Sequence, residues 1–192
     1  MSINGRTTFG GILATLLGRT SRPPVMVMPI ALFAAYGELA RQLRACLPHE
    51  HGRRSVQELL YVADVLHVAR TGRRMYPNEF MATAGGPASE LLFEYQKSDE
   101  GMAHLMHEAH RVLVDDDMRD AIADVVAKLG HANKDTIRHY SQGPGSAFRA
   151  LFIRHIAWIE TRKGPSMTTD MIHQEAERRY AKARPRVDAA AA

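Results

Sequence analysis

Residues 55–95 read SVQELLYVADVLHVARTGRRMYPNEFMATAGGPASELLFEY, and local signals in this stretch decide the fold class. Ser55 stands three residues before Glu58, a spacing at which each side chain can bond the other residue's backbone amide at a helix start. Gly72 offers the left-handed conformation that ends many helices. The spacing therefore predicts a helix over about 56–71. Its core-facing stripe recurs every three or four residues and comprises Leu59, Leu60, Ala63, Leu66 and, at its edge, His67.

The second half of the stretch predicts a corner followed by another helix. Residues 74–77 read as a short extended piece, with a turn starting near Asn78. Pro87 follows two glycines, and its fixed φ suits the first turn of a helix over 88–96. We therefore expect a mainly α, compact multi-helix domain with one short strand or hairpin near residues 74–80.

Several short pieces of this stretch occur in a recognisable order. They are Leu59-Leu60-Tyr61, His67-Val68-Ala69, Thr71-Gly72-Arg73, Phe80-Met81-Ala82, Gly86-Pro87 and Leu92-Phe93-Glu94-Tyr95. This order resembles the Panacea-domain family, the SocA-like group of bacterial antitoxins. By that resemblance the structural motif consists of Tyr61, Gly72, Gly86 and Pro87.

The resemblance also implies a function and a set of partners. A SocA-like protein is expected to be the antitoxin of a toxin-antitoxin pair in the cytoplasm, where it binds its protein toxin. It would act as a proteolytic adaptor that delivers the toxin to the ClpXP protease. Two alternatives remain open: an antitoxin that masks its toxin sterically, and a DNA-binding regulator. Nucleic acid is the disfavoured partner, because the sequence has no clear recognition helix.

The motifs of common enzymes are missing from the sequence. It contains no G-x-S-x-G, P-loop, dinucleotide fingerprint, H-E-x-x-H or paired cysteine motif, so we expect no catalytic residues and no cofactor. Binding therefore has to come from a surface, and loop residues with arginine and aromatic side chains are typical of one. The predicted partner-binding face comprises Arg70, Arg73, Arg74, Tyr76 and Tyr95. The alternative is that Tyr76 and Tyr95 pack against each other.

Length and composition favour one domain. The chain has 192 residues, 45% of them apolar, a net charge of +4 and a single cysteine, Cys46. That size suffices for one hydrophobic core, and the lone cysteine excludes an internal disulfide framework. Cys46 sits in a helical pattern, so a small buried thiol is favoured over a nucleophile.

The two ends of the chain are expected to lie outside this core. Residues 1–28 are predicted to be a flexible arm, residues 29–183 a single helical domain and residues 184–192 a disordered tail. The apolar run at 9–17 is shorter than the ~20 residues of a membrane span. The terminal alanines fit either a remnant of cloning or a small-residue end of the kind that AAA+ protease receptors grip.

Helical periodicity continues on both sides of the central stretch. Further helices are predicted over 29–47, 101–114, 133–140, 147–162 and 171–183, and between Asp115 and Gly130. The first is expected to bury Ile30, Phe33, Ala34, Gly37, Ala40, Leu43 and Leu47, and the helix over 147–162 to bury Phe148, Leu151, Phe152, His155, Ile156 and Ile159. The last is expected to be largely solvated. Asp115 and Ser146 are candidate helix caps, and Trp158 is either a core-edge residue or a partner anchor.

Histidines cluster in two places, but neither predicts a metal site. His49 and His51 lack a third ligand nearby. His104, His107 and His110 recur every three residues, whereas zinc-binding helices more often use a spacing of four. An exposed edge of histidines is the favoured interpretation of the second cluster.

Overall fold

The computed structural model describes residues 30–44, 51–76, 80–161 and 164–181, with only the backbone described for 156–161. These residues form eight helices and one three-stranded sheet, so the prediction of a mainly α domain is confirmed. The helices are α2 Ile30–Arg44, α3 Arg53–Thr71, α4 Glu90–Tyr95, α5 Asp99–Ala109, α6 Asp116–Leu129, α7 Lys134–Gln142, α8 Ala147–Thr161 and α9 Thr169–Tyr180, and the strands are β1 Phe80–Thr83, β2 Gly86–Ser89 and β3 Ser166–Met167. The predicted arm at 1–28, Cys46 and the tail at 184–192 lie outside the described residues.

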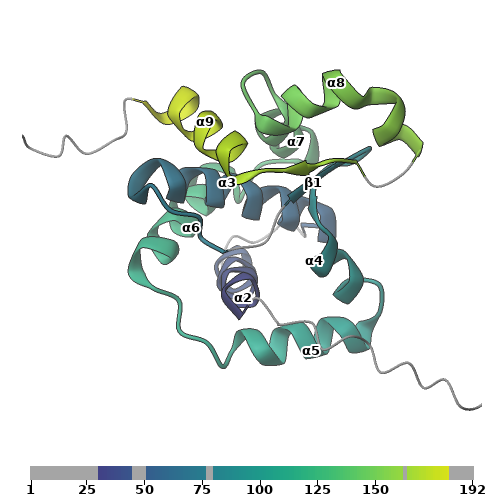
Figure 1. Cartoon of the computed structure of the whole chain (residues 1–192). Helices are drawn as coiled ribbons and strands as arrows, with labels where there is room; N and C mark the ends of the chain where they lie inside the picture. Colours follow the sequence, from purple (N-terminus) through teal and green to yellow (C-terminus); the bar gives the residue numbers. More distant parts are fainter. Residues whose placement is uncertain (1–29, 45–50, 77–79, 162–163, 182–192) are drawn as a thin grey trace, which may run out of the picture.

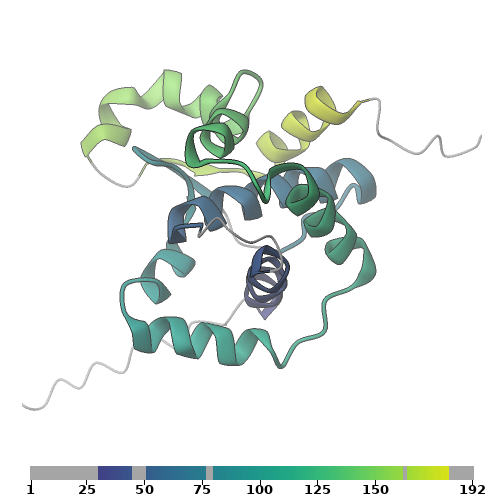
Figure 2. The same ribbon diagram turned by 180° about the vertical axis from the view of Figure 1, so that it is seen from behind.

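Helix α3 lies at the centre of the molecule. Figures 1 and 2 show it crossing the middle, with α7, α8 and α9 on one side and α2 and α5 on the other. Every residue from Ser55 to Ala69 is buried. The expectation of a single buried stripe was therefore too narrow, because neighbouring elements cover the helix on all its faces.

The ends of α3 agree with the sequence at one terminus only. Gly72 has a φ of 69° and donates its backbone N–H to the Val68 carbonyl at 2.8 Å, which confirms the predicted C-cap. At the other end α3 starts at Arg53, and its N-cap is Gly52, which has no side chain to bond an amide. The predicted capping pair of Ser55 and Glu58 is wrong, since both residues are buried inside the helix.

The small sheet lies a few residues later than the sequence suggested. Strand β1 pairs antiparallel with β2, so that Phe80 faces Ser89 and Ala82 faces Pro87. The short strand β3 pairs with the other edge of β1, giving the order β2-β1-β3. Pro87 therefore belongs to a strand, and the prediction that it opens a helix is wrong. Ser89 caps α4 instead, by accepting the Leu92 amide.

Side chains cap several helices of the second half, among them α6, α7 and α8. Asp115 accepts the Met118 amide at 2.7 Å at the start of α6, and Ser146 accepts the Arg149 amide at 3.0 Å at the start of α8, so both predicted caps are confirmed. Asn133 adds a third cap by accepting the Thr136 amide at 2.9 Å at the start of α7. These caps fix where the elements around α3 begin.

Three helices bury different faces from those expected. In α2 the side chain of Ile30 is 56% exposed, while Leu32 and Leu39 are fully buried between neighbouring helices. In α8 the non-helical backbone of His155 leaves its side chain exposed, and the side chains of Ile156, Trp158 and Ile159 lie outside the description. The expectation that α9 is largely solvated is wrong, because Ile172, Glu175 and Ala176 are buried where α9 packs on α3.

Candidate functional site

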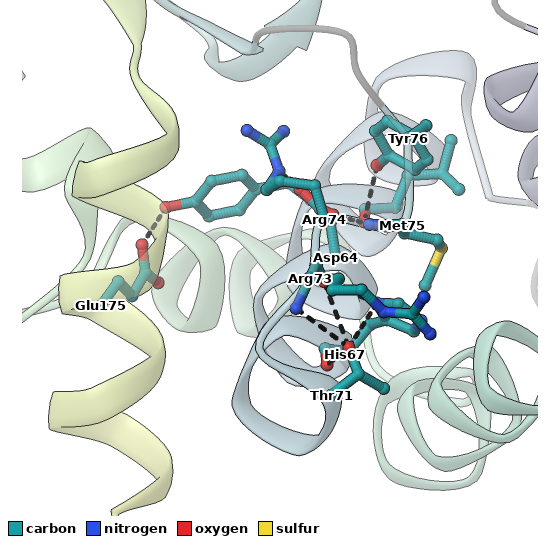
Figure 3. Close-up of polar contacts among 10 residues, drawn as sticks. Asp64, His67, Thr71, Arg73, Arg74, Met75, Tyr76 and Glu175 are labelled. Carbon is teal, nitrogen blue, oxygen red and sulfur yellow. Dashed lines mark hydrogen bonds and ion pairs between the residues drawn. The ribbon is translucent and has the colours of Figure 1, made fainter.

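The segment that leaves α3 folds back onto that helix through a buried ion pair. The Arg74 guanidinium donates from Nε to Asp64 Oδ2 at 2.6 Å, and the Met75 amide donates to Asp64 Oδ1 at 2.8 Å (Figure 3). The side chain of Asp64 is 0% exposed and that of Arg74 only 9%. Burial raises the pKa of the Asp64 carboxyl, and Arg74 and the Met75 amide oppose this rise. The pair fixes the path of the chain beyond α3.

Tyr76 continues this inward path. Its hydroxyl donates to the Leu60 carbonyl at 3.1 Å, and its ring packs against Phe80 with centroids 5.9 Å apart. Burial raises the pKa of Tyr76 well above its ordinary value. Tyr76 and Arg74 therefore belong to the interior, which corrects their assignment to a partner-binding surface.

Tyr95 lies at the other end of the molecule. Its ring packs edge-on against Phe33 at 5.1 Å and stacks on His104 at 5.7 Å. The next residue, Gln96, accepts a hydrogen bond from Gln57 in the second turn of α3, whereas Arg70 lies in the last turn, ~20 Å along the helix. The five predicted residues therefore form no single face. The alternative, that Tyr76 and Tyr95 pack together, is also wrong, because each ring has other partners.

A second buried polar group joins α9 to α3. The Tyr61 hydroxyl donates to Glu175, which also accepts the Ala147 amide at 2.7 Å and pairs with Arg179 Nε at 3.0 Å. Figure 3 shows Glu175 pointing from α9 toward this contact. Burial raises the pKa of Glu175 despite these partners, and it also raises that of Tyr61. The structural role predicted for Tyr61 is thus a helix-to-helix contact in the core.

Arg70 and Arg73 remain at the surface and line a groove beside α6. The groove has a volume of about 800 Å³ and is lined by Arg70, Thr71, Arg73, Asp117, Asp120, Ala123 and Asp124. Arg70 is half-buried and forms an ion pair with Asp124. Asp117 and Asp120 have no ion-pair partner within the described ranges. The groove therefore places two cations from the end of α3 opposite three carboxylates from α6.

An apolar pocket adjoins this groove and shares Arg70 and Asp124 with it. The pocket has a volume of about 260 Å³, and its other lining residues are Val62, Leu66, Val125, Lys128, Leu129, Tyr140 and Tyr180. We call the two cavities together the α3–α6 groove. It combines an apolar floor with charged and aromatic side chains at its rim.

Tyr140 lies within a cluster of polar and cationic groups at the rim of the groove. Lys128 Nζ donates to the Tyr140 hydroxyl at 2.9 Å and lies 4.5 Å from the ring centre, and the Tyr180 hydroxyl lies 3.1 Å away. Burial raises the pKa of Tyr140, but the hydrogen bonds from Lys128 and Tyr180 and the charges of Lys128 and Arg179 outweigh it, so the pKa falls below its ordinary value. The Tyr140 hydroxyl therefore joins α6, α7 and α9 in one hydrogen-bond network at the groove.

Most residues of this groove carry no distinctive signal in the sequence. Tyr140 and Tyr180 lie forty residues apart and on different helices, and neither belongs to a motif. The run of aspartates from Asp115 to Asp117 was a visible signal, but it read as helix-capping charge. Only Arg70 and Arg73 of the predicted face lie here.

The histidine clusters do not form a metal-ligand arrangement in the described part of the chain. Across those residues no three His, Cys, Asp or Glu side chains are arranged to hold an ion. His51 Nε2 lies 2.7 Å from the Gly130 carbonyl oxygen, and His104 stacks on Tyr95. His51 and His104 therefore each contact another part of the folded domain.

None of the helices in the described ranges combines the length and the apolar character needed to cross a membrane. Compared with protein-family models, with curated proteins and with solved structures, the chain gives no match.

Proposed function

We propose that this chain is an antitoxin that binds a protein toxin in the α3–α6 groove. The observation that carries the proposal is the continuity of two cavities: a charged groove with Arg70 and Arg73, and an apolar pocket with Tyr140 and Tyr180. An apolar centre with a polar rim is the usual anatomy of a protein interface, and tyrosine and arginine are over-represented among residues that dominate binding. The resemblance to the Panacea-domain family supplies the class of partner.

In the adaptor form of this proposal the chain also delivers the toxin to ClpXP. An adaptor needs one surface for its cargo and another for the protease, and it needs no active site. Holding the toxin at the protease raises its local concentration, so a weak degradation signal is engaged often enough to be used. The α3–α6 groove is the cargo surface in this scheme.

Identification of the partner is the first experiment. The tagged chain is recovered from its own host, and the co-purifying product of the neighbouring gene is identified. The purified pair is then incubated with ClpXP and ATP. Toxin loss that requires this chain supports the adaptor, whereas loss of the chain itself with a stable toxin indicates an antitoxin that acts by masking.

Charge reversal tests whether the groove is the toxin-binding surface. We expect Arg73→Glu to weaken toxin binding at least about tenfold, because the side chain is exposed in the groove and forms no ion pair within the described residues. Arg149→Glu is the matched control, since Arg149 is an exposed arginine on α8 outside the groove. Equal affinity of both variants and the parent would place the toxin elsewhere.

A DNA-binding regulator remains the rival from another class. The groove argues against it, because Asp117, Asp120 and Asp124 would repel a phosphate backbone. Titration with duplex DNA at several salt concentrations separates the two ideas. Affinity that falls steeply with salt and differs between sequences would favour the regulator.

A further inference from the structure

A separate cavity lies at the opposite end of α3, and from it we propose a binding site for a small phosphorylated molecule. The cavity has a volume of about 420 Å³ and is lined by His51, Gly52, Arg53, Arg54, Ser55, Ala132, Asn133 and Lys134. It lies where α3 and α7 both begin, which is ~24 Å along α3 from Arg70. We call it the α3 N-terminal pocket, and it is independent of the toxin-binding groove.

The first turn of α3 presents free backbone donors to this pocket. Gly52 has no side chain to accept an amide, and the first turn holds no acidic residue. Among the described residues, the earliest amide of α3 with a backbone partner is that of Val56, which donates to the Gly52 carbonyl at 3.2 Å. The amides of Arg53, Arg54 and Ser55 are thus left for another acceptor, and the positive end of the helix dipole favours an anion there.

Ser55 supplies an independent observation that points to a ligand. Its residue is only 5% exposed and lines the pocket, yet its hydroxyl makes no hydrogen bond to any described residue. The Ser55 hydroxyl is not one of the fully enclosed unpaired atoms among the described residues, so it keeps accessible surface and can bond a ligand oxygen that enters the pocket. A phosphate oxygen can accept from this hydroxyl and from the neighbouring amides at the same time.

Two cations of the pocket are available to such an anion. Arg53 is occupied, because it donates to the Gln96 carbonyl and pairs with Asp99 at 3.3 Å. Arg54 and Lys134 form no ion pair within the described part of the chain. The Arg54 guanidinium lies against Gly85, since a side chain on Gly85 would start 1.0 Å from Arg54 Nη2. The lack of a side chain at Gly85 therefore leaves room for the guanidinium of the pocket residue Arg54.

A carboxyl behind the pocket limits its positive charge. The buried Glu58 accepts a hydrogen bond from Gln142 at 3.0 Å, and burial raises its pKa while that hydrogen bond and the charges of Arg138, Arg54 and Lys134 lower it. A bound phosphate would share Arg54 and Lys134 with Glu58. The size of the pocket fits a phosphate group with a small substituent, whereas a duplex would need an extended basic surface.

Phosphate titration of the full chain tests the proposal. Inorganic phosphate is added at constant ionic strength while backbone amide resonances are recorded, and we expect the amides of Arg53, Arg54 and Ser55 to shift saturably. Ser55→Ala and Arg54→Gln should each weaken binding about tenfold, because each removes a hydrogen bond to a charged group. Arg149→Gln should leave the affinity unchanged. Absence of a saturable shift, or equal affinity in all variants, would overturn the proposal.

Gly85→Ala keeps the test informative if a pocket variant fails to fold. Its backbone φ is not positive, so the added methyl group displaces only the flexible end of Arg54, and we expect weaker phosphate binding with an unchanged melting temperature. Glycerol 3-phosphate against glycerol tests for the phosphorylated small molecule, and a short DNA duplex tests the other source of phosphate. Binding of the duplex without binding of either free phosphate would also overturn the proposal.

Discussion

Single polar residues of α3 hold the surrounding elements in register. Gln57 accepts the Ser89 amide at 2.8 Å and donates to Gln96 at 2.6 Å, so it ties the end of β2 and the end of α4 to the same turn. Glu58 receives a hydrogen bond from Gln142 at the end of α7. Each hydrogen bond satisfies a polar group whose burial would otherwise cost free energy, and each forms only when the neighbouring element lies in one position. Together with Asp64, these side chains specify where each neighbour packs.

Replacement of Asp64 by asparagine should reveal how much its ion pair matters. The amide side chain would keep an acceptor for the Met75 amide but would leave the buried Arg74 guanidinium without a counter-charge. We expect Asp64→Asn to lower the free energy of unfolding by about 3 kcal/mol, measured by urea denaturation. Asp120→Asn, on the exposed face of α6, should change it by less than about 0.5 kcal/mol. Similar losses in both variants would contradict the role of the pair.

The Glu175 carboxyl should make stability depend on pH in a defined direction. Burial raises its pKa in the folded chain above the ordinary value of 4.5, so the folded state binds its proton more tightly than the unfolded state. Its stabilising contribution is therefore fully present below pH ~4.5 and falls as pH rises through the folded pKa. Compared with Glu175→Gln, the parent should lose stability over this window in thermal melts at stepped pH. A difference between the two that grows with pH in the parent's favour would contradict this.

Elements were predicted well where a cap marked their ends. Asp115, Asn133 and Gly72 each have a local backbone role that is visible in the sequence, and the helices begin or end there. Pro87 misled because its φ suits a strand as well as a first helical turn, and pairing with β1 decides between them. Strand β3 has only two residues, so it has no periodicity of its own.

Burial of the predicted site residues depended on distant partners. Arg74 looked like a surface residue because nothing in its neighbourhood in sequence shows that Asp64, ten positions earlier, would bury it. Tyr140 and Tyr180 meet only after α7 and α9 have both packed on α3. Sequence patterns of helical period carry no information on such contacts, and the groove could not be assembled from them.

The hairpin gives a sharp test at the scale of the element. Gly86 has a φ of 123°, and a Cβ there would lie 2.4 Å from Gln142 Nε2 and 2.5 Å from Glu58 Oε1. Gly86→Val should therefore cost about 3 kcal/mol in urea denaturation, from backbone strain and displacement of that hydrogen bond. Gly52→Ala is the control, because its position is open and its φ is −62°, and it should cost little. An unchanged midpoint for Gly86→Val would show that the corner tolerates a side chain.

At the scale of the whole molecule, the described domain is a set of layers built around α3. Helices α6, α7 and α9 and strand β2 all pack on it, and they come from both halves of the chain. By contrast, α5 lies at one side and buries only Leu105 and Ala109. Stability should therefore be distributed unevenly, with its maximum in the central helix.

Hydrogen exchange should display this distribution. We expect amides in the middle of α3, from Leu59 to Ala69, to exchange only through global unfolding, because every side chain around them is buried. Amides of α5 should open locally and exchange faster by a factor of about ten or more. Native-state exchange followed by mass spectrometry of peptides measures both. Equal protection of α3 and α5 from exchange would contradict the idea that stability is highest in α3.

The order of the layers has a consequence for synthesis of the chain. Tyr61 is covered by Glu175 of α9, and β1 receives its outer partner from residues 166–167, more than eighty positions downstream. A ribosome delivers these covers last. While α9 is still within the exit tunnel, the apolar and polar groups of the central helix in the nascent chain lack their final partners. We expect binding of a chaperone in this interval to favour correct folding.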